Sequence, residues 1–218
     1  MKCVGLLSSG IDSPVACCSI SHCVDSFILV HADNRPFTDK REISNTIRIA
    51  KRIDEIVHSS VTLYLVSHGI MLDYLLNTAP RRYRCVLCKR MMVRYADKIC
   101  EKVSADAIVM GDSLGQVASQ TLQNIRVVNE VATYPVLRPL IGFDKEEIIV
   151  TAKKIDMFNL SILPSASCTA VPRKPATSAK IDRICEIEQS LSFGNLVDEL
   201  IDTITIVKSE DFDSFIDL

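Results

Sequence analysis

The sequence lacks any apolar run that approaches the length of a membrane-spanning helix, and we therefore expect none. The apolar segment after Met1 stops at Ser8, which is too short for the core of a secretory signal peptide, and no small-residue cleavage pattern follows it. Internal repeats and low-complexity segments are also missing. Together these absences predict a globular protein of the cytoplasm.

A large net charge is missing as well. The 25 basic and 27 acidic residues leave a formal charge of -2, so the chain as a whole is not basic enough to indicate a nucleic-acid-binding protein, and any such surface has to be local. Hydrophobic residues make up 48% of the 218 residues and charged residues 24%, as is typical of a folded soluble protein. The length predicts one large domain, or one domain with a small appendage.

Cysteine, in contrast, is abundant. The nine cysteines are odd in number, and a chain of this length does not need disulfide bonds to stabilise its fold. We therefore expect reduced thiols. Cys85 and Cys88 are spaced as a ligand pair at the start of a predicted helix, whose terminus lowers a thiol pKa. Two ligands are too few for a metal site. Cys168, in a proline-bounded loop, is the candidate for a third ligand. The others lie in apolar elements or at their ends and are expected to be small buried hydrophobes: Cys3, Cys17, Cys18, Cys23, Cys100 and Cys185.

Short apolar runs alternate with stretches of helical apolar spacing along the chain. This order predicts an α/β fold, a doubly wound parallel sheet with helices on both faces. After Ile155 the pattern loosens, and a helix near 179–191 and an apolar tail near 197–207 follow. The predicted strands are 4–7, 27–30, 61–66, 107–110 and 134–137, and the predicted helices are 14–20, 39–56, 70–76, 85–103, 119–128 and 144–155.

Ligands of such sheets bind beyond the carboxyl ends of the strands. Three loops that follow strands stand out by composition, at 8–13, 31–37 and 111–119. The first places serines and a glycine before a helix with Pro14 in its first turn, an arrangement that suits a phosphate at a helix N-terminus. Asp12 would repel that phosphate unless Mg²⁺ lay between them. The loop lacks the Gly-Lys-Ser/Thr ending of a Walker loop, and an ordinary turn with Asp12 or Ser13 as the helix cap is the alternative.

The loop sequence SSGIDS at 8–13 resembles the Ser-Gly-Gly-x-Asp-Ser signature of the PP-loop ATP pyrophosphatases. The resemblance implies a Rossmann-like fold of the adenine nucleotide alpha hydrolase type, with Mg²⁺ on Asp12 and cleavage of ATP to AMP and pyrophosphate as a substrate is adenylated. Ser9 stands where the family has glycine. A positive φ there would strain a serine, and we predict that the serine is tolerated. The residues that the resemblance implies in nucleotide binding are Ser8, Ser9, Gly10, Ile11, Asp12, Ser13, His31, Gly111, Asp112, Gln116 and Gln120.

Three further stretches resemble the PP-loop domain of the tRNA 4-thiouridine synthetases, which are thiamine-linked sulfurtransferases. They are CVLCKRMM at 85–92, GDSLGQVASQTLQN at 111–124 and PVLRPLIGFDKEEII at 135–149. The resemblance runs from Lys2 to about Ala176. It implies an ATP-dependent tRNA sulfurtransferase that adenylates the uridine at tRNA position eight and replaces its 4-oxygen with sulfur, giving 4-thiouridine. The catalytic residues would be Asp12, Lys145, which aligns with the lysine needed for adenylation, and Cys168, which aligns with the sulfur-handling cysteine.

The same resemblance bears on the cysteines. In the subgroup that carries Cys-x-x-Cys and lacks a rhodanese domain, Cys85, Cys88 and Cys168 resemble the ligands of an iron-sulfur cluster of the 4Fe-4S type, with one iron left open to external sulfide. A structural zinc site, the alternative, would want four ligands, and no fourth Cys or His is obviously placed.

Basic residues gather on the segments around these cysteines. We expect them to hold tRNA phosphates with an affinity that falls with salt, and a solvated helix face is the alternative. The candidate RNA-binding residues are Arg81, Arg82, Arg84, Lys89, Arg90, Arg173 and Lys174.

The resemblance divides the chain into a PP-loop ATP pyrophosphatase domain at 1–176 and a helical extension at 177–218 packed on it. The family's THUMP module and rhodanese domain are not found in the sequence. The expected partners are therefore tRNA, a separate THUMP-type tRNA-binding protein, sulfide or a cysteine desulfurase as the sulfur source, and a second copy of the chain. Three other functions stay open: 2-thiolation of cytidine or uridine by another PP-loop enzyme, an AMP-forming amidotransferase-type synthetase, and a non-catalytic ATP- or metal-binding subunit of a sulfur-transfer complex.

Overall fold

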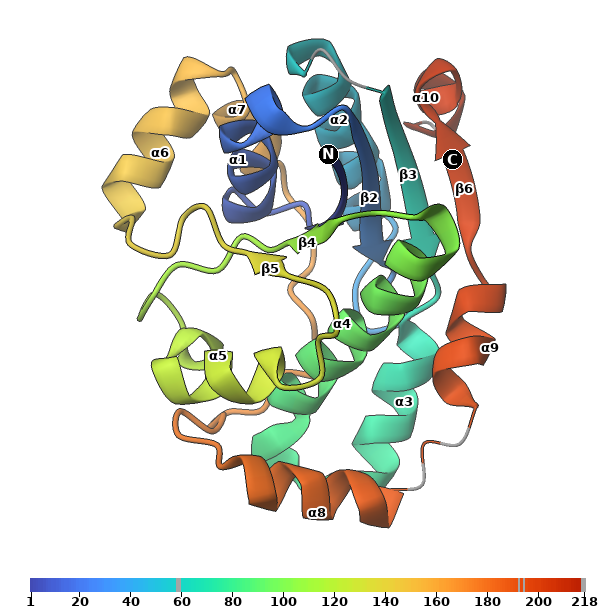
Figure 1. The fold of residues 1–218 in the computed structure, drawn as a ribbon, viewed down its shortest axis with the longest axis vertical. Helices are drawn as coiled ribbons and strands as arrows, with labels where there is room; N and C mark the ends of the chain where they lie inside the picture. Colours follow the sequence, from blue (N-terminus) through green and yellow to red (C-terminus); the bar gives the residue numbers. More distant parts are fainter. Residues whose placement is uncertain (58–59, 192, 194, 217–218) are drawn as a thin grey trace.

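A six-stranded sheet lies at the centre of the protein in a computed structural model that describes residues 1–57, 60–191, 193 and 195–216 (Figure 1). The strand order is β5-β4-β1-β2-β3-β6. The first five strands pair in parallel, and β6 runs antiparallel to β3. The strands are β1 Lys2–Leu7, β2 Ser26–Ala32, β3 Ser60–Val66, β4 Ala107–Val109, β5 Val136–Leu137 and β6 Thr205–Lys208. The predicted α/β fold is thus confirmed, with a sheet that is parallel except for β6.

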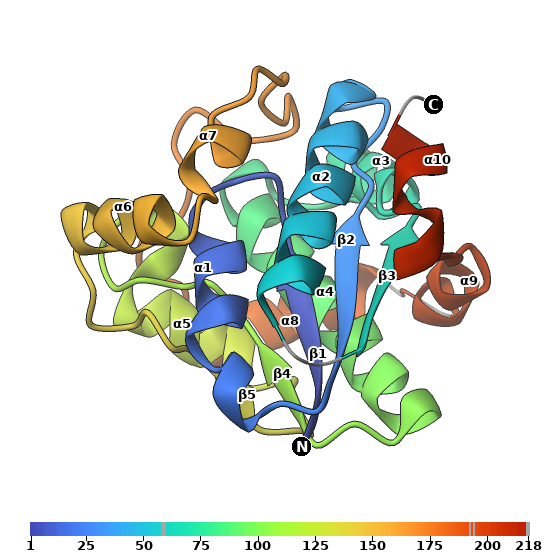
Figure 2. The ribbon, with the colours of Figure 1, turned by 90° about the horizontal axis from the view of Figure 1, so that it is seen from above.

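Helices cover both faces of the sheet (Figure 2). They are α1 Asp12–Ser19, α2 Arg41–Ile56, α3 Gly69–Thr78, α4 Arg84–Val103, α5 Leu122–Asn129, α6 Lys145–Lys154, α7 Phe158–Ser161, α8 Ile181–Leu191, α9 Leu196–Asp202 and α10 Phe212–Ile216. No helix among the described residues is long and apolar enough to cross a membrane.

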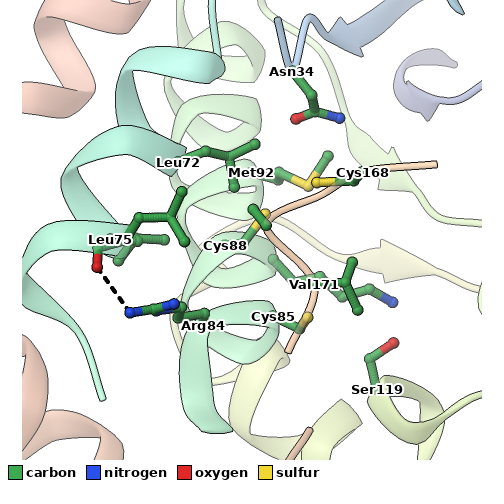
Figure 3. Close-up of a pocket in the computed structure, with 13 residues that line it drawn as sticks. Asn34, Leu72, Leu75, Arg84, Cys85, Cys88, Met92, Ser119, Cys168 and Val171 are labelled. Atoms are coloured by element: carbon green, nitrogen blue, oxygen red, sulfur yellow. Dashed lines mark hydrogen bonds between the residues drawn. The ribbon is translucent and has the colours of Figure 1, made fainter. Parts of the chain in front are cut away.

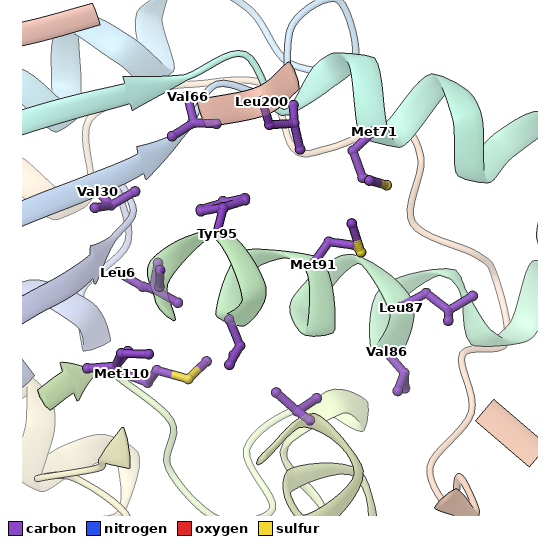
Figure 4. Packing of buried hydrophobic residues seen from close by; sticks show 14 of the residues in the cluster. Leu6, Val30, Val66, Met71, Val86, Leu87, Met91, Tyr95, Met110 and Leu200 are labelled. Atoms are coloured by element: carbon purple, nitrogen blue, oxygen red, sulfur yellow. The ribbon is translucent and has the colours of Figure 1, made fainter. Parts of the chain in front are cut away.

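The core has two parts because successive side chains of a strand point to opposite faces of the sheet. Val4 and Leu6 of β1 join the part that also contains residues of α3, α4, α5, α8 and α9. Cys3 and Leu7 of the same strand join the part that contains residues of α1, α2, α6 and α10. In the first part, Tyr95 of α4 packs among apolar side chains from β1, β2 and β3 (Figure 4).

The C-terminal segment differs from the expectation of helices alone. The apolar tail predicted near 197–207 divides into α9 and β6, and β6 extends the sheet beyond β3. Val207 of β6 is fully buried, whereas Ile206 is 54% exposed, as expected of an edge strand with one covered face. The division of the chain into a domain and an extension stays a prediction.

Candidate active site at the carboxyl edge of the sheet

The turn after β1 leaves the N-terminus of α1 open. Ser13 Oγ accepts the backbone N–H of Ser8 at 2.9 Å, and Ser8 Oγ accepts that of Gly10 at 3.3 Å. Ile11 occupies the helix-cap position and provides no side-chain cap, so neither Asp12 nor Ser13 acts as the cap. Since the first amides of a helix need acceptors, this turn suits an anion better than it suits the alternative of an ordinary capped helix.

The backbone at Ser9 carries no strain of the kind that a serine would suffer in place of glycine. Among the described residues, positive φ angles occur at Ser104, Gly115 and Asp156. Ser9 adopts none, so a side chain is compatible with its conformation.

Gly111 brings the end of β4 against this turn. A Cβ atom at Gly111 would lie 2.5 Å from the backbone nitrogen of Ser13 and 2.7 Å from the carbonyl carbon of Asp12. Only glycine allows an approach this close, and the loops after β1 and β4 therefore form one surface.

Lys145, the first residue of α6, lies beside Asp12 of α1. Its Nζ lies 2.8 Å from Oδ1 of Asp12, and both side chains are partly exposed. The helix holds Lys145 in place through a capping box, in which Asp144 and Glu147 each accept a backbone N–H of the other. The sequence pattern alone did not reveal this structural role of the two acidic residues.

Asp112, which follows Gly111, is a buried carboxylate with two cationic partners. Lys89 Nζ lies 2.8 Å from one oxygen and Arg138 Nε 3.1 Å from the other. Burial acts to raise the pKa of Asp112, but the two cations outweigh it and hold the pKa below its usual value. Arg138 was not singled out in the sequence, although it lies in the stretch 135–149.

The three candidate cysteines line one pocket of about 230 Å³ (Figure 3). Cys85 and Cys88 reach it from α4, and Cys168 reaches it from the loop after α7. Burial raises the pKa of all three thiols, that of Cys88 to about 12, while Lys89 opposes the rise at Cys85 and Cys88. The apolar part of the lining is formed by Leu72, Leu75, Leu76, Met92, Ala170 and Val171.

The pocket does not hold a preformed metal site. Over the ranges that the structure describes, no three His, Cys, Asp or Glu side chains are grouped closely enough to bind a metal ion. The described cysteines are all free thiols. Three thiols facing one pocket nevertheless provide the kind of ligand that iron-sulfur clusters use.

Two buried histidines lie at the same sheet edge. Nδ1 of His31 donates to the carbonyl of Leu7 at 3.1 Å, and burial lowers the His31 pKa. His31 is 1% exposed and supports the turn after β1 without facing solvent. His68, which no sequence pattern singled out, lies with Nε2 3.1 Å from Sγ of Cys88, and burial lowers its pKa to about 4.

The two predicted glutamines lie in different surroundings. Gln116 is exposed, whereas Gln120 is 6% exposed. The carbonyl of Gln120 accepts the N–H of Gly115, and its side-chain Oε1 has no partner among the described residues. Ser119, next to it, lines the cysteine pocket. The loop after β4 therefore touches both the pocket and the turn after β1.

The predicted RNA-binding residues separate into two groups. Arg81, Arg82, Arg173 and Lys174 are exposed. Arg84 donates to the carbonyls of Leu76 and Ala79 and so caps the end of α3, while Lys89 pairs with Asp112.

The structure corrects the prediction that Arg90 binds RNA. The residue is 1% exposed and pairs with Glu188 at 2.7 Å and Glu130 at 2.8 Å. A guanidinium so enclosed cannot reach an RNA phosphate, and the prediction is wrong for this residue. Its role is to attach α8 to α4, in a network that Arg94 completes.

Comparisons with known proteins show the family of this chain. The family described as Thiamine biosynthesis protein (ThiI) matches residues 1–193. A "Probable tRNA sulfurtransferase" of Methanobrevibacter smithii is 39% identical over 204 residues, which make up 93% of this chain and 54% of the relative. A protein of the same name from Thermus thermophilus is 40% identical over 89% of this chain and 48% of its own length. The chain thus spans about half the length of the curated relatives it matches.

Solved structures are similar to this chain as well. A 4-thiouridine synthetase in complex with RNA and with bound ATP has a TM-score of 0.90 at 33% identity, over 94% of this chain and 54% of that chain. The NMN synthetase of Francisella tularensis has a TM-score of 0.52 at 12% identity, over 99% of this chain and 83% of its own, and shares the fold alone.

Proposed function

The chain belongs to the ThiI family, and from this membership and the geometry of the site we propose that it is an ATP-dependent tRNA sulfurtransferase. Its reaction is the adenylation of a tRNA uridine, at position eight, followed by replacement of the 4-oxygen with sulfur to give 4-thiouridine. One observation carries the proposal. Lys89 follows Cys88 on α4 and pairs with Asp112, whose neighbour Gly111 lies against the turn after β1. A phosphate-binding turn and a thiol pocket are therefore joined by one continuous set of contacts.

The turn at 8–13 would hold the pyrophosphate of ATP. Backbone amides at the start of α1 and the hydroxyls of Ser8 and Ser13 supply donors, and Asp12 would hold Mg²⁺, which commonly binds one or two carboxylates together with substrate phosphates. The uridine 4-oxygen attacks the α-phosphorus, and the bond to pyrophosphate breaks. Lys145, beside Asp12, stabilises the negative charge that develops on the phosphoryl oxygens.

The thiol pocket would supply sulfur. Cys85, Cys88 and Cys168 would hold an iron-sulfur cluster, and the fit rests on three thiols that face one pocket whose other lining is largely apolar. A bound cluster would supply sulfur of the sulfide oxidation level for transfer to the adenylated base. Transfer of this sulfur to C4 of the adenylated uridine would break the C4–O bond, and AMP would leave with the original oxygen. Lys89 and Arg138 keep Asp112 ionised between the two sites.

The RNA would bind through exposed basic residues near the pocket. Arg81 and Arg82 precede α4, and Arg173 and Lys174 follow Cys168. Contacts of this kind bind phosphates and weaken as salt rises. The target uridine has to leave its stack to be reached, as other bases that undergo enzymatic modification do. A separate THUMP-type protein, and sulfide or a cysteine desulfurase, are the proposed partners in the cytoplasm.

The test is anaerobic reconstitution with iron and sulfide, followed by incubation with ATP and unmodified tRNA. Digested tRNA is analysed for 4-thiouridine by mass spectrometry, with and without an added THUMP protein. Cys168→Ser should abolish the thiolated nucleoside, and Cys23→Ser, at an exposed cysteine that is not part of the pocket, is the matched control. A 2-thiolated nucleoside, or full activity of Cys168→Ser, would overturn the proposal.

A further inference from the structure

His68 occupies a fixed position between the sheet edge and the cysteine pocket. Its backbone N–H donates to the carbonyl of Val66 at 2.7 Å, and that of Gly69 donates to the carbonyl of Asp33 at 2.9 Å. A Cβ atom at Gly69 would lie 1.8 Å from the carbonyl oxygen of Arg35, so the loop after β2 packs directly on the start of α3. These contacts leave the backbone at His68 little freedom to move.

The His68 ring is enclosed on all sides. The residue is 0% exposed, and its ring meets that of Tyr95 edge to face, with centroids 5.8 Å apart. Nε2 lies 3.1 Å from Sγ of Cys88, and Nδ1 has no hydrogen-bond partner among the described residues. Among the described residues, Sγ of Cys88 is thus the hydrogen-bond partner of the His68 ring.

The unpartnered Nδ1 decides which nitrogen carries the hydrogen. A neutral imidazole has one N–H, and a buried N–H without an acceptor costs about 1–3 kcal/mol. A hydrogen on Nδ1 would be buried in that way even if the S–H of Cys88 donated to Nε2, whereas a hydrogen on Nε2 meets the Cys88 sulfur. The favoured tautomer therefore has Nε2 as the donor and sulfur as the acceptor.

We propose that His68 is a positioning residue that donates a hydrogen bond from Nε2 to Sγ of Cys88, aims this sulfur at the pocket shared with Cys85 and Cys168, and stabilises the negative charge that the sulfur carries once it is a thiolate in a bound cluster. The part of the proposal that concerns a bound cluster rests on the proposed function. Hydrogen bonds to sulfur are among the factors that set the reduction potential of an iron-sulfur cluster. Loss of this donor should lower the potential, because added electron density on the cluster would be less well stabilised.

The first test needs no cluster. Nitrogen NMR of the apo-protein, labelled with ¹⁵N-histidine, reports the tautomer of each ring, and His68→Gln identifies the signal of His68 by its disappearance. We expect the Nε2–H tautomer. A His68 ring with its hydrogen on Nδ1 would overturn the proposal.

The second test measures the reduction potential after anaerobic reconstitution of the unaltered protein and three variants. His68→Leu removes the donor and should lower the potential. His68→Gln, whose amide N–H can reach a similar position, should keep it closer to that of the unaltered protein. Tyr95→Phe is the control, because it keeps the ring contact and removes a hydroxyl without a partner among the described residues.

The outcomes separate the two proposals. Equal potentials and equal iron content in all four proteins would overturn the role of His68. If the unaltered protein takes up no iron, the proposed cluster is wrong, and the NMR result still decides the hydrogen bond. If His68→Leu does not fold, the comparison of His68→Gln with the unaltered protein and the tautomer remain as tests.

Discussion

Nζ of Lys145 lies 2.8 Å from Oδ1 of Asp12, which joins the first turn of α6 to the first turn of α1 across 133 residues of sequence. A cation at a helix N-terminus opposes the helix dipole, so the position is unfavourable by itself. It becomes favourable beside a carboxylate and beside the phosphates that we propose for the turn.

Lys145→Met should therefore lower the rate of tRNA-dependent pyrophosphate release by about 100-fold or more, the cost of removing one donor to a developing charge. Lys154→Met, at an exposed position at the other end of α6, is the matched control and should leave the rate unchanged. Pyrophosphate release is followed by a coupled assay. Equal rates for the two variants would remove Lys145 from the proposed chemistry.

Gly111→Ala should weaken ATP binding and destabilise the fold by about 1–3 kcal/mol, because the added Cβ would press on the backbone of Ser13. Gly142→Ala adds the same atom where nothing lies within 4 Å and should have little effect on either quantity. Calorimetric titration with ATP and thermal unfolding measure the two effects. ATP binding that survives in Gly111→Ala would argue against the turn as the nucleotide site.

Glu188 should make stability depend on pH between about 4.5 and 2. Burial acts to raise its pKa, but Arg94 and Arg90 outweigh burial and lower the pKa from 4.5 to about 2. A carboxylate with a depressed pKa stabilises the folded state above its unfolded pKa, and this contribution is lost as the pH falls through the folded value.

Glu188→Gln should remove a contribution of about 3 kcal/mol at neutral pH and flatten the acid side of the stability curve. Glu186→Gln, on the same helix and paired with exposed Arg183, is the control. Urea unfolding at a series of pH values gives both curves. Parallel curves for the two variants would show that the buried pair does not control acid stability.

Reversal of charge at Arg81 and Arg82 should weaken tRNA binding at low salt. The slope of log affinity against log salt should fall by about 1 for each phosphate that the protein no longer neutralises. Reversal of Lys51 and Lys208, which lie on α2 and β6, changes the net charge equally and is the control. Filter binding over a salt series gives the slopes. If the two double variants bind alike, the basic residues before α4 form only a solvated surface.

Local sequence patterns predicted the strands and loops well because each depends on neighbouring residues. The apolar runs at 27–30 and 61–66 fall within β2 and β3, and the helical spacing at 39–56 contains α2. The loops rich in serine and glycine follow β1 and β4, as expected where parallel strands end.

Features that depend on distant residues could not be predicted in this way. Arg90 shares a basic stretch with its neighbours, and only the position of Glu188, 98 residues away, shows that it is buried. The need for glycine at position 111 arises from backbone contact with Ser13 across the sheet edge. His68 carries no motif, and its relation to Cys88 depends on how α3 packs on α4.

The antiparallel strand β6 has a consequence for how the chain folds. Its pairing with β3 joins residues more than 130 positions apart, and closing a loop of that length is slow. Until β6 docks, the outer edge of β3 presents unpaired N–H and C=O groups, which invite pairing with another chain. Newly made protein is therefore most prone to aggregate in the interval before β6 pairs with β3.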